Sequence, residues 1–421
     1  MSEKSILESF AAYRQTLPQQ ARIYVGGCSG EPLPLADALA AAPHLADGLT
    51  FLGIWIPGVN ATDWANSHAG ARAESIFISP ALRPSFDAGR TAFLPLSYTG
   101  SVRWLETTPI DGGVVMISPP DKDGMVSLGV SADFSTLIIA RESIPLMGVV
   151  NTALVPPIHG PKIPLSRFQV LAETTHPLVQ VEDATLPGTF DKIGQHIASL
   201  CEAGDTLQFG LGNVQQAVLK ALGSHQGMRI HAGMISNPII DLLDADVITN
   251  EYGAVTTGVA IGTDALYAKA AADDRILFAP VNFTHAISTL ADIKRFKAIN
   301  SCIEVDLFGQ ANAEFIRGRQ ISGTGGLVDF LRGAAVSEGG RAILALASTA
   351  KQGEISRIVP RLPNDATSIA RADVDTVVTE HGIATLKHKS IDARARALIE
   401  IADPAFREHL SAAWHEIRKG L

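Results

Sequence analysis

The chain has 421 residues, of which 46% are hydrophobic and 18% are charged, and it carries a formal net charge of −9. This length favours two domains, and the apolar fraction is large enough to fill folded cores, which excludes a disordered chain. The acidic balance, without blocks of like charge, excludes a nucleic-acid-binding protein that uses a basic face.

Cysteine usage indicates the compartment. The chain has three cysteines, Cys28, Cys201 and Cys302, which lie far apart and form no C-x-x-C pair. This pattern is typical of a reducing environment. The first residues show no basic segment followed by an apolar one, and the longest apolar stretches, such as 342–347, have the length of a strand. We therefore expect a cytoplasmic protein without a secretion signal and without a membrane partner.

Short apolar segments alternate with helical patterns in both halves of the chain, which is typical of βαβ units and mainly parallel sheets. The predicted strands are 22–25, 48–52, 114–117, 136–139, 207–209, 229–230, 342–345 and 376–378. The fold class predicted from this alternation is α/β, with an open, mainly parallel sheet in each half.

A proline-rich stretch separates the two halves. The prolines of 155–164 exclude a regular helix, because proline lacks an N–H donor and restricts the residue before it. Residues 171–189 are expected to be extended, and a helix with one apolar face is expected at 191–201. We place the domain boundary here, with an N-terminal domain at 1–185 and a C-terminal domain at 186–421.

The end of the chain has the signals of a helix. Asp403 is the predicted cap and Pro404 the first helical residue, since proline is tolerated at that position. Apolar residues follow at helical spacing, namely Phe406, Leu410, Trp414 and Ile417. We expect this face to pack on the second domain.

The segment 206–222 joins an apolar strand, a glycine turn and an amphipathic helix. Gly210 and Gly212 can take positive φ, and a helix that starts near Asn213 directs unpaired N–H groups and its positive dipole end at the turn. Such a corner would stabilise a phosphate or an oxyanion. The same two glycines are equally typical of a turn that only joins a strand to a helix.

A second glycine-rich turn contains Gly323, Gly325 and Gly326 and runs into Asp329. It would let a long ligand lie against the backbone, and the alternative is a tight loop required by packing alone.

Lys351 and Arg357 flank another glycine and can either contact phosphates or form a solvated basic edge. The histidines, including His231 and His381, have no metal-ligand spacing, so no metal is predicted.

Five segments occur together in one order: 117–130, 206–222, 320–334, 346–360 and 377–386. Together they resemble the acetyl-CoA hydrolase/transferase family, which contains acetate, butyrate and 4-hydroxybutyrate CoA-transferases. The resemblance covers nearly the whole chain.

This resemblance implies two open, mainly parallel-sheet domains of CoA-transferase type, with the active site in the cleft between them, and a homodimer. It implies coenzyme A, as an acyl-CoA substrate, and a carboxylate as the second substrate. The residues expected at the thioester end are Gly210, Leu211, Gly212, Asn213 and Val214. Those expected along the pantetheine and the nucleotide are Gly323, Gly325, Gly326, Asp329 and Lys351.

The resemblance also implies a glutamate nucleophile, which forms an acyl anhydride and then a glutamyl-CoA thioester. In the family members compared, this glutamate lies two residues after a histidine. When His231 and Met234 are aligned with that pattern, Gly233 stands at the nucleophile position. Glycine has no side chain that could act as nucleophile or base.

Three readings follow. The chain is a transferase or hydrolase that uses another carboxylate, for which Glu251 is the nearest candidate in sequence, or it activates water or substrate differently, or it binds CoA esters without turning them over. Glu251 is equally typical of a solvated surface or cap residue. Cys28 and Cys302 are possible thiol nucleophiles, but they are also typical of small buried apolar residues.

Overall fold

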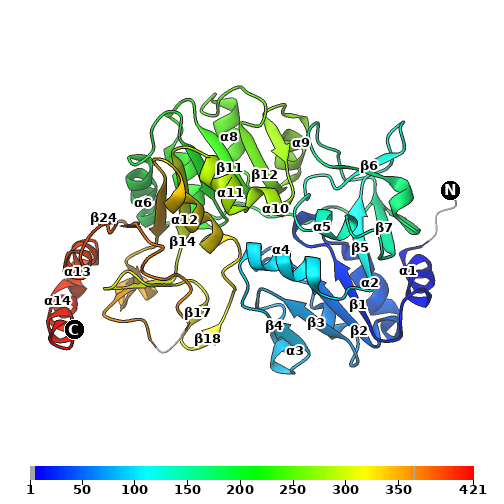
Figure 1. Cartoon of the computed structure of the whole chain (residues 1–421), viewed down its shortest axis with the longest axis horizontal. Helices are drawn as coiled ribbons and strands as arrows, with labels where there is room; N and C mark the ends of the chain where they lie inside the picture. Colours follow the sequence, from blue (N-terminus) through cyan, green and yellow to red (C-terminus); the bar gives the residue numbers. More distant parts are fainter. Residues whose placement is uncertain (1–4, 364–365) are drawn as a thin grey trace. The chain divides into compact units, whose positions relative to one another are not determined.

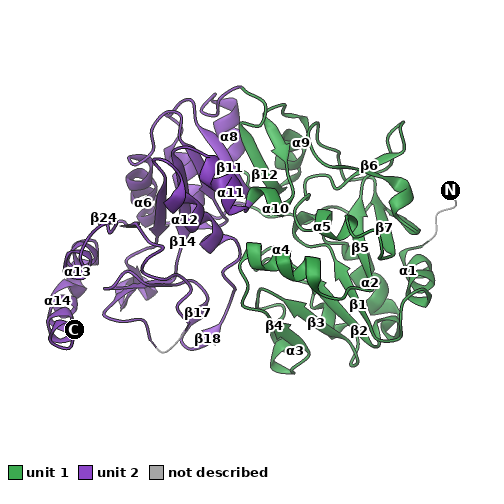
Figure 2. Ribbon diagram, viewed as in Figure 1, with its two compact units in different colours: residues 1–182, 234–237, 251–284 green, residues 183–233, 238–250, 285–421 purple. Residues whose placement is uncertain are grey.

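The computed structural model describes residues 5–363 and 366–421. The chain clusters into two compact units (Figure 2). Unit 1 comprises residues 1–182, 234–237 and 251–284, and unit 2 comprises residues 183–233, 238–250 and 285–421. Two segments from the second half of the chain thus cluster with the first unit. The contiguous domains 1–185 and 186–421 stay a prediction.

Unit 1 is built on a seven-stranded sheet with the order β4-β3-β2-β1-β5-β7-β9 (Figure 1), in which every neighbouring pair is parallel. These strands are β1 (Ala21–Val25), β2 (Leu49–Gly53), β3 (Arg72–Ser75), β4 (Thr91–Phe93), β5 (Gly112–Ile117), β7 (Leu146–Asn151) and β9 (Val170–Thr174). The remaining strands of the unit are β6 (Met125–Ser127), β8 (Lys162–Pro164), β12 (Val255–Ala260) and β13 (Ile276–Phe278). Its α-helices are α1 (Ile6–Gln15), α2 (Leu33–Ala41), α3 (Arg83–Asp87), α4 (Tyr98–Thr107), α5 (Ser135–Ile139), α9 (Asp264–Ala272) and α10 (Val281–Thr284).

The central strands β5 and β7 of unit 1 are buried along their whole length. This is typical of a parallel sheet that is covered on both faces. Helix α1 begins with a capping box between Ser5 and Glu8. Its side chains Phe10 and Tyr13 are fully buried and belong to the same core cluster as Phe51 of β2.

Unit 2 contains the strand order β11-β10-β14-β19-β23-β24, in which only the last pair is antiparallel. These strands are β10 (Thr206–Phe209), β11 (Arg229–Ile235), β14 (Phe296–Ser301), β19 (Arg341–Ala345), β23 (Thr376–Thr379) and β24 (Gly382–Thr385). The last two residues of β11 cluster with unit 1. Short strands form small sheets, namely β15 (Glu304–Asp306), β16 (Ala311–Asn312), β17 (Phe315–Ile316), β18 (Arg319–Gln320), β20 (Thr349–Ala350), β21 (Ile355–Ser356) and β22 (Ile358–Val359).

The α-helices of unit 2 are α6 (Gly188–Ala198), α7 (Asn213–Ala221), α8 (Ile239–Asp244), α11 (Ile287–Asp292), α12 (Leu327–Val336), α13 (Ile391–Glu400) and α14 (Pro404–Lys419). Helix α14 confirms the prediction for the end of the chain: the Asp403 carboxylate accepts a hydrogen bond from the Ala405 N–H at 2.9 Å. Leu410 and Trp414 are buried in the core of this unit.

The predicted α/β class with mainly parallel sheets is confirmed, and seven of the predicted strands coincide with observed ones. The prediction for 136–139 is wrong, because these residues lie in the helix α5. A short apolar run that is buried on all sides has the same composition in either state, so its periodicity does not distinguish them. The predicted helix at 191–201 begins earlier and ends at Ala198.

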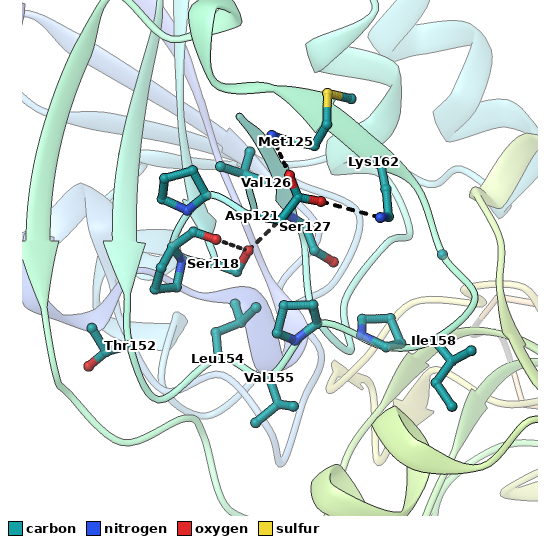
Figure 3. Close-up of a pocket in the computed structure, with 15 residues that line it drawn as sticks. Ser118, Asp121, Met125, Val126, Ser127, Thr152, Leu154, Val155, Ile158 and Lys162 are labelled. Carbon is teal, nitrogen blue, oxygen red and sulfur yellow. Dashed lines mark hydrogen bonds and ion pairs between the residues drawn. The ribbon is translucent and has the colours of Figure 1, made fainter. Parts of the chain in front are cut away.

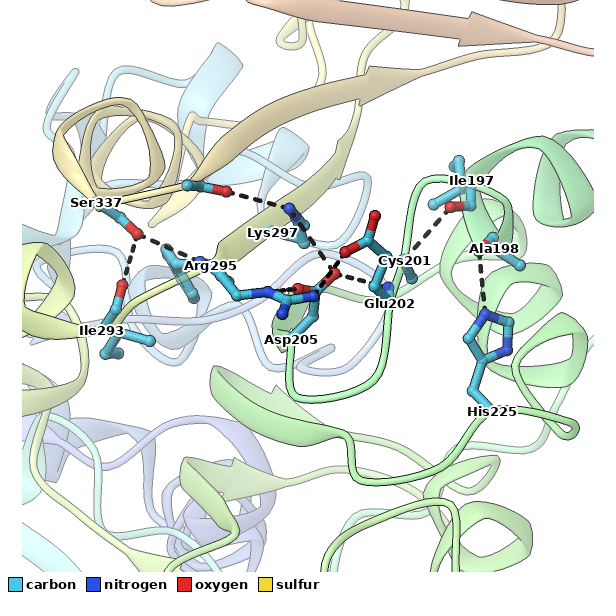
Figure 4. Close-up of polar contacts among 12 residues, drawn as sticks. Ile197, Ala198, Cys201, Glu202, Asp205, His225, Ile293, Arg295, Lys297 and Ser337 are labelled. Atoms are coloured by element: carbon cyan, nitrogen blue, oxygen red, sulfur yellow. Dashed lines mark hydrogen bonds and ion pairs between the residues drawn. The ribbon is translucent and has the colours of Figure 1, made fainter.

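A buried carboxylate joins the first ends of β10 and β14 (Figure 4). Asp205 is fully buried, and its Oδ1 accepts a hydrogen bond from Arg295 Nε at 2.7 Å. Its Oδ2 accepts from the Glu202 N–H at 2.8 Å and lies 3.7 Å from Lys297 Nζ. These contacts fix the two strands side by side, so that their carboxyl ends also lie together at the opposite edge of the sheet.

Candidate active site

The predicted corner after β10 is a strand–turn–helix in the structure. Gly212 has φ +115° and is the residue before α7, and no side chain of the described residues caps the helix there. The first intrahelical bond of α7 runs from the Gln216 N–H to the Gly212 carbonyl at 3.1 Å. The preceding N–H groups of α7 have no acceptor within the helix, as at every helix start. Gly210 is not in the positive-φ region, so the expected left-handed backbone holds for Gly212 only.

This corner lies where the strand order of unit 2 changes direction. Strand β10 is followed in the chain by β11 on one side, whereas the later strand β14 lies on its other side. In open α/β sheets such a reversal leaves a crevice beyond the carboxyl ends of the two strands, and ligands bind in it. The topology therefore favours the segment 210–214 as a ligand site.

Carboxamide side chains tie the carboxyl ends of β10 and β14 together. Asn300 Nδ2 donates to Gln208 Oε1 at 2.8 Å, and Gln215 Nε2 of α7 donates to Ser301 Oγ at 2.9 Å. The first turn of α7 is thus anchored to the end of β14. Buried amide and hydroxyl groups that are paired in this way fix the backbone around Gly212.

The second glycine-rich turn leads into α12. Gly325 has φ +54°, and Gly326 is the residue before the helix. Gly323 is buried, and Asp329 lies in the first turn of α12 with only 5% of its surface exposed. The predicted turn is present, and a contact with pantetheine stays a prediction.

The structure brings Gly233 and Gly326 together around a residue that sequence reasoning missed, His285. A Cβ atom on Gly233 would lie 2.8 Å from Cε1 and 3.0 Å from Nε2 of the imidazole. A Cβ atom on Gly326 would lie 2.5 Å from Cδ2 and closer still to Nε2. The ring also packs on Phe330 of α12, with a centroid distance of 4.4 Å. His285 has no motif spacing in the sequence, so no local signal identifies it.

Burial determines the charge of this histidine. His285 is 1% exposed, and burial, together with the neighbouring His231, lowers its pKa to about 3. The imidazole is therefore neutral near pH 7. His231, on β11, is itself buried and packs edge-on against Phe296. Among residues 5–363 and 366–421, no group of three or more His, Cys, Asp or Glu side chains is arranged to hold a metal.

Lys351 is exposed and has φ +50° in the tight turn after β20. Close to this turn, Ser348 donates from its N–H at 2.9 Å and from Oγ at 2.7 Å to the two carboxylate oxygens of Glu380. Glu380 follows β23 and lies in the family-like segment 377–386, which is the sequence signal that could have pointed to it. Whether Lys351 contacts phosphates stays a prediction.

The remaining candidate nucleophiles lie apart from this arrangement in sequence or are buried. Glu251 is exposed in the turn before β12 and belongs to unit 1. The cysteines are free and buried. Burial raises the pKa of Cys302 to about 12 and that of Cys28 well above its usual value. The thiol form dominates in both, which favours the interpretation as buried apolar residues.

Unit 1 contains a pocket of about 520 Å³ (Figure 3). It is lined mainly by apolar side chains from two stretches, 118–127 and 152–162, of which the first belongs to a family-like segment. Lys162 Nζ lies 3.3 Å from Asp121 Oδ2 at its edge. This cavity was not predicted from the sequence.

Comparisons with known proteins connect both units to one family. Residues 10–181 match the acetyl-CoA hydrolase/transferase N-terminal domain, and residues 262–414 match the C-terminal domain of the same family. The chain is 34% identical over 402 residues to a 4-hydroxybutyrate coenzyme A transferase of Clostridium kluyveri, with 94% of each protein covered.

Solved structures of similar fold support the same family assignment. RipA from Yersinia pestis superimposes with a TM-score of 0.88 and 27% identity, covering 97% of each chain. A 4-hydroxybutyrate CoA-transferase from Porphyromonas gingivalis gives a TM-score of 0.79 at 29% identity, covering 98% of this chain and 97% of the other. None of the helices in the described ranges is both long and apolar enough to cross a bilayer. With its two domain models and this similarity along nearly its whole length, the chain belongs to the acetyl-CoA hydrolase/transferase family.

Proposed function

We propose that the chain cleaves the thioester of an acyl-CoA at the corner formed by residues 210–214, and that no side chain at residue 233 takes part. Membership of the family makes the protein an acyl-CoA-processing enzyme that acts by CoA transfer or by hydrolysis. A carboxylate is the acceptor in the first case and water in the second.

The observation that carries the proposal is the geometry of the corner. Gly212, at φ +115°, opens the start of α7 at the point where the strand order reverses. Attack on a thioester passes through a tetrahedral anion, and backbone N–H groups at a helix start stabilise such a charge. The corner supports an oxyanion site, with Leu211, Asn213 and Val214 beside the thioester.

The second glycine turn supports the pantetheine side of the same site. Gly323, Gly325 and Gly326 expose backbone to a long, thin ligand, and Asp329 follows them at the start of α12. Lys351 is proposed to meet the nucleotide phosphates, because its exposed side chain is cationic. The acyl-CoA is a substrate, and we propose no metal.

Two candidates remain for the group that attacks the thioester. Gly233 stands at the position where the family resemblance implies a glutamate. A relocated carboxylate, for which Glu251 is the candidate, and direct attack by water both satisfy the chemistry. We further propose a cytoplasmic homodimer, as the cysteine usage and the family resemblance respectively indicate.

The test combines turnover with trapping. Purified protein is incubated with short, branched and aromatic acyl-CoAs, with and without acetate, and free CoA and new acyl-CoA are measured. Hydroxylamine or borohydride then traps any glutamyl-CoA, and the labelled peptide is identified. We expect thioester cleavage without a label at residue 233. A label on the peptide that contains Glu251 would establish the relocated nucleophile.

Calorimetry with CoA separates the alternatives. Binding without cleavage of any acyl-CoA would show a CoA-ester-binding protein, and a wild-type chain that binds no CoA would refute the proposal.

A further inference from the structure

The space beside Gly233, where a side chain would begin, is crowded by the His285 ring. The Cε1–Nε2 edge of the His285 ring faces Gly233 closely. A Cβ atom at residue 233 would lie 2.8 Å from Cε1 and 3.0 Å from Nε2. Real Cβ atoms do not approach other heavy atoms at 2.8 Å, so a side chain at 233 requires the ring to move. The imidazole therefore occupies the room that a nucleophilic glutamate would need.

The ring is held on its other sides as well. Gly326 leaves no room for a Cβ beside Cδ2, and Phe330 packs against the ring at a centroid distance of 4.4 Å. With the end of β11, the glycine turn and the start of α12 all against one buried imidazole, a shift of the ring moves at least one of them. His285 thus sets the spacing between the backbones of Gly233 and Gly326, the second of which lies in the turn proposed for the pantetheine.

The charge state agrees with this arrangement. His285 and His231 are both buried, and the pKa of His285 lies far below neutral pH, mainly because of burial. A neutral ring offers no cation to pair with a carboxylate at 233. Position 233 is half-buried, so a carboxylate there would lose part of its hydration without gaining an ion pair, and the glycine and the histidine suit each other.

We infer that Gly233 and His285 form a matched pair, in which His285 excludes a carboxylate from position 233 and acts as the positioning residue of a site where water attacks the thioester. This inference rests on the proposed function. In the reaction the water oxygen bonds to the thioester carbonyl carbon, the carbon–sulfur bond breaks, and the proton lost by water ends on the CoA sulfur. The products are the carboxylic acid and free CoA, so the reaction requires no other reactant.

Covalent trapping tests the exclusion. Wild type, G233E, H285A and G233E/H285A are each incubated with acetyl-CoA and acetate and treated with hydroxylamine. We expect a glutamyl-CoA label on the peptide that contains residue 233 only in the double variant, where the smaller side chain leaves room for glutamate. A label in G233E alone would overturn the pair, as would its absence from a folded double variant that still binds CoA.

Kinetics test the positioning role. In H285A we expect kcat for thioester hydrolysis to fall at least tenfold while KM changes less than about threefold, because the ring is argued to act on backbone geometry and not on binding. H285F, which fills the same room and can pack on Phe330, should recover most of the rate. The matched control is H225A, which removes a partly buried histidine whose Nε2 lies 3.2 Å from the Ala198 carbonyl oxygen. Unchanged kcat in H285A, or an equal loss in H225A, would contradict the role.

Thermal unfolding tests, independently of activity, whether Gly233 and His285 are matched. G233E should lower the Tm, and adding H285A should raise it again, because the clash is removed. Additive losses in the double variant would overturn the pair even if the protein cleaves acyl-CoA. If the wild type neither binds CoA nor cleaves a thioester, the proposed function fails, and the Tm cycle still decides whether Gly233 and His285 are matched.

Discussion

The two units place a glycine loop at the same topological point and use it differently. In unit 1 the strand order reverses beside β1, and the loop after this strand contains Gly26, Gly27 and Gly30. In unit 2 it reverses beside β10, which is followed by Gly210 and Gly212. Both loops lie at a carboxyl edge where open α/β sheets bind ligands.

The loop of unit 1 is filled by its own neighbours. A Cβ atom on Gly27 would overlap the carbonyl oxygen of Ile54 and lie 3.0 Å from its carbon, and one on Gly30 would lie 2.9 Å from Ser131 Oγ. Two buried carboxyl groups border this loop, Glu31 and Asp133, and burial raises their pKa values to about 7 and about 8. Here the glycines make room for protein atoms.

The loop of unit 2 is open. No heavy atom of the described chain lies within 4 Å of a Cβ on Gly210, and the nearest to one on Gly212 is Gln215 Oε1 at 3.4 Å. The glycines of this loop are not required by packing, which leaves backbone conformation and access for a ligand as the reasons for them. A glycine loop at a reversal point is therefore evidence for a binding site only when its surroundings are empty.

Gly27→Ala should have the largest effect on stability. Its added methyl group would clash with the backbone carbonyl of Ile54, the residue that follows β2. Because a backbone carbonyl cannot rotate away as a side chain can, we expect a loss of about 3 kcal/mol in the free energy of unfolding. Urea denaturation measures it. The control in the same unit is Gly100→Ala in α4, where the new methyl makes only ordinary contacts at 3.6 Å. Equal urea midpoints for the two variants would show that the loop of unit 1 is not packed as described.

Gly212→Val should act on the ligand. Valine is strained at φ +115°, so the turn must change its backbone, and the start of α7 moves with it. We expect CoA affinity to fall at least 100-fold, about 2.7 kcal/mol, in isothermal titration calorimetry. The same affinity as wild type in a folded variant would remove the corner from the site.

The contrast between the loops also shows what the sequence could predict. Strand–turn–helix order, the parallel sheets and α14 follow from local patterns of apolar residues, glycine and caps, so residues 206–222 and 403–417 were interpretable without a structure. The room around a glycine depends on atoms distant in sequence. For this reason the sequence could not tell the filled loop after β1 from the open loop after β10.

The same reason explains the residue that was missed. Gly233 was identifiable because it stands at a defined position of a family pattern. Its spatial neighbour His285 follows α10 and belongs to no motif. Only tertiary packing places its ring against Gly233 and Gly326. The misassigned segment 136–139 is similar, since only its packing decides between helix and strand.

Asp133→Asn should change how the stability of the protein depends on pH. Asp133 is buried, and its Oδ1 accepts no hydrogen bond from the described residues. Its pKa of about 8 in the folded protein lies above that of an unfolded aspartate, about 4. The stability that the protonated group contributes is therefore complete below about pH 4 and is lost as the pH rises toward 8.

Asparagine does not titrate, so the variant should gain on wild type by about 1 kcal/mol per pH unit between pH 5 and 7. Urea midpoints at several pH values measure this difference. Parallel curves for the two proteins would show that Asp133 does not hold its proton in the folded state.

Gly210→Ala should have the smallest effect and is the closest control for Gly212→Val. Gly210 is outside the positive-φ region, and its Cβ position is empty among the described residues, so alanine fits without strain. We expect a change below about 0.5 kcal/mol in the free energy of unfolding and a loss of CoA affinity smaller than that of Gly212→Val. If Gly210→Ala weakens CoA binding as much as Gly212→Val does, the ligand must approach the backbone along the whole turn. The conformation of Gly212 would then not be what distinguishes the open loop from the filled one.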